Sequence, residues 1–193
     1  MSMDNQTLEK RYNELCNSPS DINEHLPTLK RYAEECGHIT EMGVREIVST
    51  YALLIGQPKT LVSIDIIHPT KFGASLEDIV SFAKEMDVNF KFCESDTLSV
   101  DIDETDLLFI DTKHNYYQLK GELKRHGNKA FKYIIFHDTF LFENRDETSD
   151  QPSDKSGLLP AIDEFLETNS HWSCHEVFEN NNGLTILKRR NTQ

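Results

Sequence analysis

The sequence lacks any long apolar run. No stretch approaches the roughly 18 apolar residues that a membrane-spanning helix needs, so we expect no association with a membrane. Positive charge is also scarce, because 20 Lys and Arg against 33 Asp and Glu give a formal net charge of −13. Nucleic-acid binding depends on clustered Lys and Arg that replace phosphate counterions. We therefore expect no nucleic-acid partner.

Cysteine is rare, and its four positions include no C-x-x-C pair: they are 16, 36, 93 and 174. The first fifteen residues, MSMDNQTLEKRYNEL, are polar and acidic rather than typical of a secretory signal. Both observations lead us to expect reduced thiols and a cytoplasmic location. His171, Cys174 and His175 crowd together, but zinc needs a fourth ligand and usually paired ligand spacing. We interpret these three as incidental polar residues at a strand end.

The length of 193 residues fits one domain with a short additional segment. Apolar residues recur at helical spacing over residues 4–17 and 25–36, and a breaker run, NSPSD, separates the two stretches. We predict an N-terminal helical flank or lid over residues 1–37 and a second unit over residues 38–190.

From residue 38 onward, strand and helix patterns alternate. Helices are expected over 44–55, 76–86, 115–127 and 158–166, and strands over 39–42, 60–67, 89–93, 106–110 and 131–136. Two last strands, 172–178 and 184–188, flank NNNG, which has the chemistry of a hairpin turn. Alternation of this kind, with continuously apolar strands, indicates a parallel sheet covered by helices on both faces. We predict a doubly wound, Rossmann-like α/β fold with a mostly parallel seven-stranded sheet and an antiparallel terminal hairpin strand.

Ligands of such sheets bind beyond the carboxyl ends of the strands, at the switch point. Each of the first five predicted strands ends at or beside an acidic residue: Glu41, Asp65, Glu94, Asp111 and Asp138. These side chains would converge on one crevice. Like charges gathered there repel one another unless a cation or a ligand amine balances them.

Several of these residue types have a chemical use at a strand end. Gly43 allows close approach of the backbone to a ligand, and an acidic residue such as Asp65 is placed for a ribose diol. Asp111 and Asp138 suit a shared divalent cation such as Mg²⁺, and His114 is suited to accept a substrate proton.

Structural roles explain the same residues equally simply. Gly43 can be a tight turn, Asp65 and Asp138 can cap loops, and His137 can be a packed, hydrogen-bonded histidine. The remaining histidines without a supporting neighbourhood are expected at the surface: His25, His68 and His126.

Five segments carry a resemblance to a known family: EMGVREIVSTYALL (41–54), LVSIDI (61–66), DLLFIDTKHNYYQLKGEL (106–123), YIIFHDT (133–139) and the tail from GLLPAIDEFL to NNNGLTIL (157–187). In this order they resemble class I S-adenosylmethionine-dependent methyltransferases. The similarity is to the small-molecule O-methyltransferase branch, which includes macrocin-type and cephalosporin-hydroxylase-like proteins. It covers about residues 38–188.

The resemblance implies roles for particular positions. For the cofactor, it implies a turn formed by Glu41 and Gly43 and a methionine carboxylate near Ser49 and Thr50. It further implies that Asp65 binds the ribose hydroxyls and that Ser95 and Asp96 lie beside adenine. Asp111 would contact both the cofactor and the metal. For a metal, it implies the ligands Asp111 and Asp138 with His137 near the third position, and for proton transfer the base His114, with Lys113 as the alternative.

The chain departs from the family pattern at two places. Arg45-Glu46-Ile47 follow Gly43 where a second glycine is common, and His137-Asp138 stand where two acidic ligands are common. The leading hypothesis is methyl transfer from S-adenosylmethionine to a hydroxyl of a small polar acceptor such as a sugar, assisted by Mg²⁺ or another divalent cation. A second hypothesis is a non-catalytic nucleoside-binding or assembly protein that keeps the fold.

A nicotinamide-dependent oxidoreductase ranks lower, because no G-x-G-x-x-G motif follows the first predicted strand. Small members of this fold often dimerise, which leaves a homodimer open.

Overall fold

The computed structural model describes residues 5–148 and 154–190. Its seven strands form one sheet in the order β3-β2-β1-β4-β5-β7-β6. β1 to β5 pair in parallel, and β7 runs antiparallel between β5 and β6. The strands are β1 (His38–Met42), β2 (Thr60–Asp65), β3 (Asn89–Glu94), β4 (Thr105–Ile110), β5 (Ala130–His137), β6 (Trp172–Phe178) and β7 (Leu184–Arg189). The predicted fold class is confirmed.

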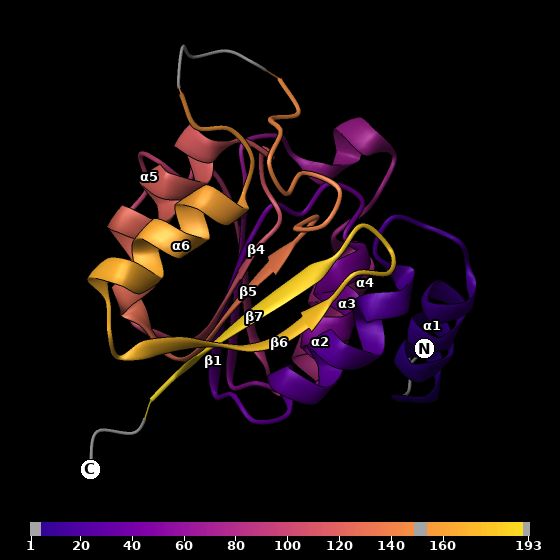
Figure 1. The fold of residues 1–193 in the computed structure, drawn as a ribbon. Helices are drawn as coiled ribbons and strands as arrows, with labels where there is room; N and C mark the ends of the chain where they lie inside the picture. The colour runs from indigo at the N-terminus through magenta and orange to yellow at the C-terminus, as the bar shows by residue number, and fades with distance from the viewer. Residues whose placement is uncertain (1–4, 149–153, 191–193) are drawn as a thin grey trace.

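Helices cover both faces of this sheet (Figure 1). One face carries α1 (Asn5–Asn17), α2 (Leu26–Ala33), α3 (Val48–Ile55) and α4 (Glu77–Glu85), and the other carries α5 (Tyr116–His126) and α6 (Leu159–Thr168). Short 3-10 turns lie at Asn23–His25, Pro69–Phe72 and Gly127–Lys129. Among the described residues, no helix has the length and apolar character that crossing a bilayer requires.

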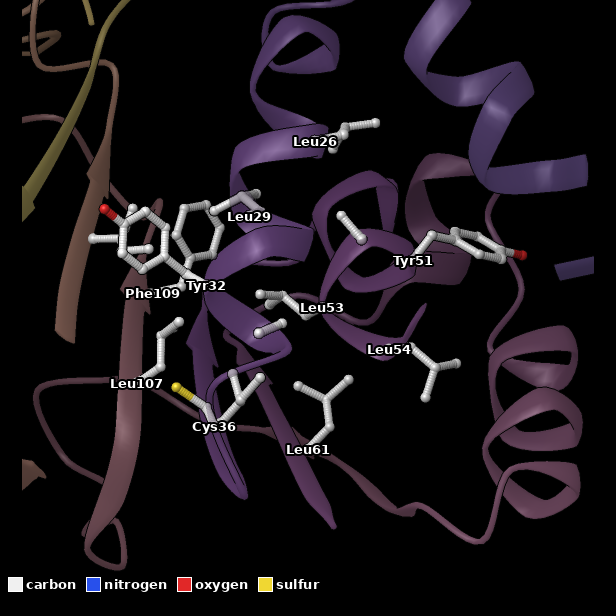
Figure 2. Packing of buried hydrophobic residues seen from close by; sticks show 14 of the residues in the cluster. Leu26, Leu29, Tyr32, Cys36, Tyr51, Leu53, Leu54, Leu61, Leu107 and Phe109 are labelled. Atoms are coloured by element: carbon white, nitrogen blue, oxygen red, sulfur yellow. The ribbon is translucent and has the colours of Figure 1, made fainter. Parts of the chain in front are cut away.

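Two hydrophobic clusters hold the three layers together. Successive side chains of a strand point to opposite faces of a sheet. In β4, Leu107 and Phe109 therefore join the cluster beneath α1–α4, whereas Leu108 and Ile110 join the cluster beneath α5 and α6. Figure 2 shows the first cluster, where Leu107 and Phe109 face the helices. Burial on both faces explains why the parallel strands are apolar throughout.

The N-terminal flank shares the first of these clusters. Leu8 of α1 and Leu26 and Leu29 of α2 are buried with Leu53 of α3. The ring of Tyr32 also meets that of Tyr133 in β5 edge to face, with centroids 4.7 Å apart. A common apolar core thus spans the predicted boundary at residue 37.

One helix begins later than the pattern predicts. The helix expected over residues 44–55 starts at Val48, and a turn over residues 43–47 precedes it. Arg45 and Ile47 there have positive φ angles of 42° and 59°, which a helix does not allow. The tertiary cause is Asp65, whose Oδ2 accepts the amides of Val44 and Arg45 at 2.7 and 3.0 Å.

Two histidines expected at the surface are buried, so that expectation was wrong for them. His25 lies under the β6–β7 hairpin, where its Nε2 donates to the carbonyl oxygen of Asn180 at 2.9 Å. His126, the last residue of α5, is also buried, and its Nε2 donates to the carbonyl oxygen of Thr97 at 2.7 Å. In both cases a remote carbonyl accepts a hydrogen bond from Nε2, and local sequence carries no signal for such a partner.

Truncation of Leu29 tests whether the flank belongs to the core. We expect Leu29→Ala to lower the free energy of unfolding by about 2–5 kcal/mol in a single urea transition, because a fully buried leucine is lost from a shared cluster. The control Val80→Ala removes a side chain that is 53% exposed and should change it by less than about 0.5 kcal/mol. A separate early transition for Leu29→Ala, with the main one unchanged, would show an independent lid.

Candidate active site

A cavity of about 470 Å³ opens at the carboxyl ends of the parallel strands, within the usual size range of small-molecule sites. Its lining comes from the N-terminal flank, the loops after β1 to β4, the start of α5 and the loop before α6. The sequence-predicted residues in this lining are Gly43, Ser49, Asp65, Asp96, Asp111, Lys113 and His114. Residues that the sequence did not single out include Ile66, Ile67, Phe72, Thr97, Gln118 and Glu147.

Gly43 is required where β1 meets this cavity. Its φ is +87°, and a Cβ atom there would lie 1.8 Å from the carbonyl oxygen of Asp111. Only glycine fits such a contact. Arg45, the non-glycine residue two positions later, has a positive φ of 42°, and its guanidinium bonds to Asp21 of the flank at 2.8 Å. The left-handed conformation at this position is therefore kept without a second glycine, and the side chain is directed to the flank.

Two acidic residues at the ends of β2 and β3 line the cavity: Asp65 is the last residue of β2, and Asp96 lies two residues after β3. Asp65 lines the cavity, and besides the two turn amides it accepts the amide of Ile67 at 2.9 Å. The amide of Ser95 donates to the carbonyl oxygen of Asp65 at 2.8 Å. The carboxylate of Asp96 accepts from Leu98 N at 2.9 Å and caps the loop, and Asp96 also lines the cavity. The parallel pairing of β2 with β3 produces this arrangement.

Glu41 lies behind the cavity wall, fully buried. Ser49, Thr50 and Ser63 donate their hydroxyls to its carboxyl group at 2.6, 2.8 and 2.5 Å. Burial raises the pKa of Glu41 to about 7, although these three hydrogen bonds act in the opposite direction. Of this group only Ser49 borders the cavity, so Glu41 and Thr50 support the turn from behind.

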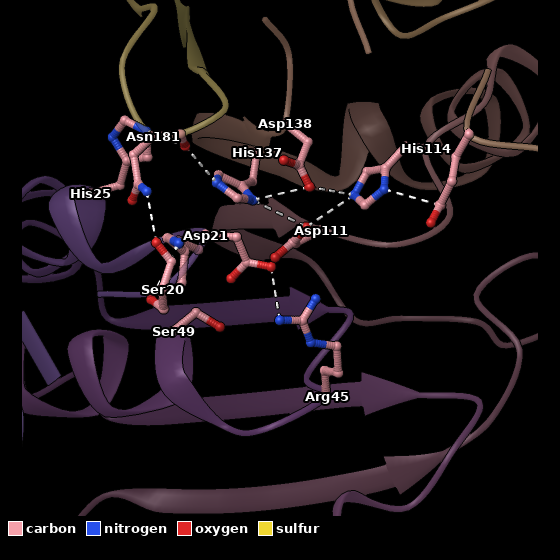
Figure 3. Close-up of polar contacts among 12 residues, drawn as sticks. Ser20, Asp21, His25, Arg45, Ser49, Asp111, His114, His137, Asp138 and Asn181 are labelled. Atoms are coloured by element: carbon pink, nitrogen blue, oxygen red, sulfur yellow. Dashed lines mark hydrogen bonds and ion pairs between the residues drawn. The ribbon is translucent and has the colours of Figure 1, made fainter. Parts of the chain in front are cut away.

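A cluster of two carboxylates and two imidazoles forms where β4 and β5 end. Asp111 and Asp138 lie between the rings of His114 and His137 (Figure 3). His114 Nε2 is 2.8 Å from Asp138 Oδ2 and 3.3 Å from Asp111 Oδ1. His137 Nδ1 is 3.4 Å from each carboxylate. The structure thus gathers the three metal candidates and His114 at the end of these two strands. Lys113, the alternative base, lines the cavity but is not part of this cluster.

Charge alternates around this cluster. Burial disfavours the charged imidazoles, but hydrogen bonds and the charges of Asp111 and Asp138 outweigh it, so the pKa values of His114 and His137 rise to about 10. Burial likewise opposes ionisation of Asp138, yet the two histidines lower its pKa to about 2, and they hold the pKa of Asp111 below its usual range. This arrangement favours the positively charged form of both imidazoles.

Asp138 has the features of a ligand-holding residue. Its φ of 60° is strained for a non-glycine residue, and it is only 5% exposed. Its Oδ1 is buried without a hydrogen-bond partner among the described residues. Asp111, His114 and Asp138 each offer one ligand atom, and these atoms lie within 4.8 Å of one another. The donors therefore fit a divalent cation, and His114 belongs to the compact group.

Neighbouring segments orient both rings. Asn181 O accepts from His137 Nε2 at 3.2 Å, so Nδ1 is the nitrogen that faces the carboxylates. Phe142 stacks on His114 with centroids 4.7 Å apart, and Glu147 lies 3.2 Å from its Nδ1. The hairpin signal NNNG was visible in the sequence, whereas its approach to His137 was not.

The fold of this chain is similar to that of several solved structures. A protein from Corynebacterium glutamicum has a TM-score of 0.66 at 13% identity, covering 100% of this chain and 94% of that one. An O-methyltransferase from Bacillus cereus, solved with S-adenosylhomocysteine, has a TM-score of 0.63 at 16% identity, covering 97% and 92%.

The O-methyltransferase TomG from Streptomyces achromogenes, solved with S-adenosylmethionine, has a TM-score of 0.58 at 14% identity, covering 99% and 92%. The chain has the class I methyltransferase fold. No family model and no curated protein sequence matches it. At sequence identities of 13–16%, the similarity establishes the fold alone.

Glu41→Gln tests the buried carboxyl group. A glutamate in the unfolded chain has a pKa near 4.5, whereas folding raises it to about 7. Between these pH values the folded protein keeps a proton that the unfolded chain has lost. The free energy of unfolding of the wild-type protein, minus that of Glu41→Gln, should therefore fall by about 3 kcal/mol as the pH rises through this window.

Urea denaturation across pH 4.5 to 7 measures this difference. Glu85→Gln, at an exposed position on α4, is the control for loss of a negative charge alone. A wild-type-minus-E41Q difference that stays constant with pH would contradict the assignment.

Proposed function

We propose that this protein transfers a methyl group from S-adenosylmethionine to a hydroxyl of a small polar acceptor, such as a sugar. The observation that carries the proposal is a single cavity with two unlike ends. Asp65, Asp96 and apolar side chains border the end at β2 and β3, and the carboxylate–imidazole cluster borders the end at β4 through Asp111 and His114. Asp138 and His137 lie behind these two residues and do not line the cavity. Solved proteins of this fold that bind S-adenosylmethionine or S-adenosylhomocysteine support the cofactor class.

The first end suits the nucleoside part of the cofactor. Asp65 is placed for ribose hydroxyls, and Ser95 and Asp96 for the edge of adenine. Ile66 and Phe72 line the cavity although they are 65% and 40% exposed. Exposed apolar side chains beside a cavity offer a face for a flat base. Ser49, in the first turn of α3, is placed to bind the methionine carboxylate of the cofactor.

Methyl transfer needs little covalent participation from the protein. The bond from the methyl carbon to sulfur breaks as the bond to the acceptor oxygen forms, and the hydroxyl proton leaves. The chain contributes by holding oxygen and methyl sulfonium in line. His114 is the proposed proton acceptor, with Lys113 as the alternative, and it can act only as the neutral imidazole.

Asp111 and Asp138, with His137, would hold a divalent cation, and His114 would remain available as the proton acceptor. When bound, such an ion lowers the pKa of a coordinated hydroxyl and orients the acceptor. Imidazole nitrogen beside carboxylate oxygen suits first-row transition ions better than Mg²⁺, which prefers oxygen ligands. The carboxylates that would bind the ion also keep the proton on His114, so ion binding and protonation of His114 compete.

Calorimetric titration tests the cofactor class. The wild-type protein should bind S-adenosylmethionine and S-adenosylhomocysteine but not NAD. Asp65→Asn should weaken S-adenosylhomocysteine binding about tenfold or more, because hydrogen bonds to a charged carboxylate are lost.

Asp103→Asn, at an exposed position outside the cavity, is the matched control. Absence of binding in folded wild-type protein would contradict the proposal. Binding without methyl transfer to any hydroxyl acceptor would favour a non-catalytic nucleoside-binding protein.

The metal assignment can be tested with Mn²⁺. We expect Mn²⁺ to bind about tenfold or more tightly than Mg²⁺ in competition. Pulsed electron paramagnetic resonance of the bound Mn²⁺ should show a nitrogen coupling that weakens in His137→Gln. Methyl transfer by His114→Gln should fall about 100-fold or more, while S-adenosylhomocysteine binding stays intact.

His175→Gln, an exposed histidine on β6, is the control and should leave the spectrum unchanged. Bound Mn²⁺ with no nitrogen coupling would assign the site to oxygen ligands alone.

A further inference from the structure

A second buried carboxyl group, Glu122 of α5, lies behind the cavity. Thr97 and Thr112 donate their hydroxyls to it at 2.6 and 2.8 Å, and Gln118 donates its Nε2 at 2.8 Å. Glu122 is completely buried and does not border the cavity, whereas Thr97, Thr112 and Gln118 do. The three lining side chains are therefore held from behind by one carboxyl group.

This network leaves one orientation for the amide of Gln118. The single hydroxyl hydrogen of Thr97 is given to Glu122, so Thr97 Oγ1 accepts the second hydrogen of Gln118 Nε2, at 3.0 Å. Both neighbours are acceptors, and the NH₂ group must face them. Gln118 Oε1 points the opposite way and has no hydrogen-bond partner among the described residues. Because Gln118 lines the cavity, its Oε1 is an oriented acceptor there that has no partner among the described residues.

The position of this acceptor identifies the part of a ligand that it meets. Thr97 follows Asp96 in the loop after β3, and β3 pairs with β2, which ends at Asp65. In the sheet, β2 and β3 lie on one side of β1, and β4 with the carboxylate–imidazole cluster lies on the other. Gln118, although it belongs to α5, therefore serves the end of the cavity opposite Asp138.

The other acceptors at this end, the carboxylates of Asp65 and Asp96, each have hydrogen-bond partners within the protein. Both carboxylate oxygens of Asp96 accept hydrogen bonds from its own loop, from Leu98 N at 2.9 Å and Ser99 Oγ at 3.1 Å. Ile66 and Phe72 offer no polar atom in their side chains. An unpaired acceptor on a partly apolar wall selects a ligand that carries a donor at that point, because a second acceptor placed there would be repelled and left unpaired.

We propose that Gln118 is a base-specificity residue that accepts a hydrogen bond from the exocyclic amino group of adenine, and that Glu122 and Thr97 are its positioning residues. The assignment rests on the proposed binding of an adenosyl cofactor. A purine with a 6-oxo group presents an acceptor at the same place and is disfavoured.

Titration of the full chain with S-adenosylhomocysteine and S-inosylhomocysteine tests this assignment. Wild-type protein should bind the adenine compound about tenfold or more tightly. Gln118→Met keeps the length of the side chain without the acceptor and should reduce the preference to about twofold. Glu122→Gln offers a donor to Gln118, allows its amide to turn over, and should likewise reduce the preference.

Thr97 separates positioning from a merely structural effect. Thr97→Ser keeps the hydroxyl and should retain the preference, whereas Thr97→Val should lose it. Gln57→Met, at an exposed glutamine outside the cavity, is the matched control. Circular dichroism establishes that each variant folds, and the Thr97 pair decides the question if Gln118→Met does not.

The outcomes distinguish the two proposals. If wild-type protein binds neither compound, the proposed function fails and the role of Gln118 fails with it. If wild-type protein prefers adenine and both Gln118→Met and Thr97→Val keep the preference, the role of Gln118 is overturned while the proposed function stands.

Discussion

The contact between Gly43 and the carbonyl oxygen of Asp111 is the constraint on which the rest of the site depends. A side chain at residue 43 has no room there, so the chain after β1 turns tightly over the end of β4. Asp65 then binds the amides of that turn and joins the end of β2 to it. Three neighbouring strand ends are thereby held at fixed spacing, and the cavity opens above them. Backbone geometry at this point, more than any one side chain, determines where a ligand can lie.

Buried carboxyl groups in this protein are stabilised in two different ways. Glu41 and Glu122, behind separate walls of the cavity, are surrounded by hydroxyl and amide donors, and no cation is among their hydrogen-bond partners in the described residues. Asp111 and Asp138 instead face two imidazoles, and the opposite charges stabilise one another. The first arrangement supports lining residues without adding a charge to the cavity. The second places charged side chains at one end of the cavity, so the two ends of the cavity differ in charge.

Most of the fold was predictable because its signals are local. Continuous apolar strands, helical spacing and the NNNG turn predicted every strand within about two residues, and the acidic strand ends predicted the edge of the sheet that carries the cavity. The start of α3 was not predictable from local sequence. The preceding turn is held by Asp65, which lies 21 residues after Val44 in the chain. His25 was wrongly expected at the surface for the same reason. Its hydrogen-bond partner, Asn180, is 155 residues away.

The sequence alone determined the fold class and the set of polar residues at the strand ends, since both follow from periodicity within short windows. Tertiary structure decided which of those residues contact one another and which line the cavity. The insertion of β7 between β5 and β6 brings Asn181 to His137, the register of β4 and β5 brings His114 between two carboxylates, and α5 carries Gln118 to Thr97. Each of these contacts joins elements that are remote in the chain. Their geometry depends on packing between layers, which no local pattern encodes.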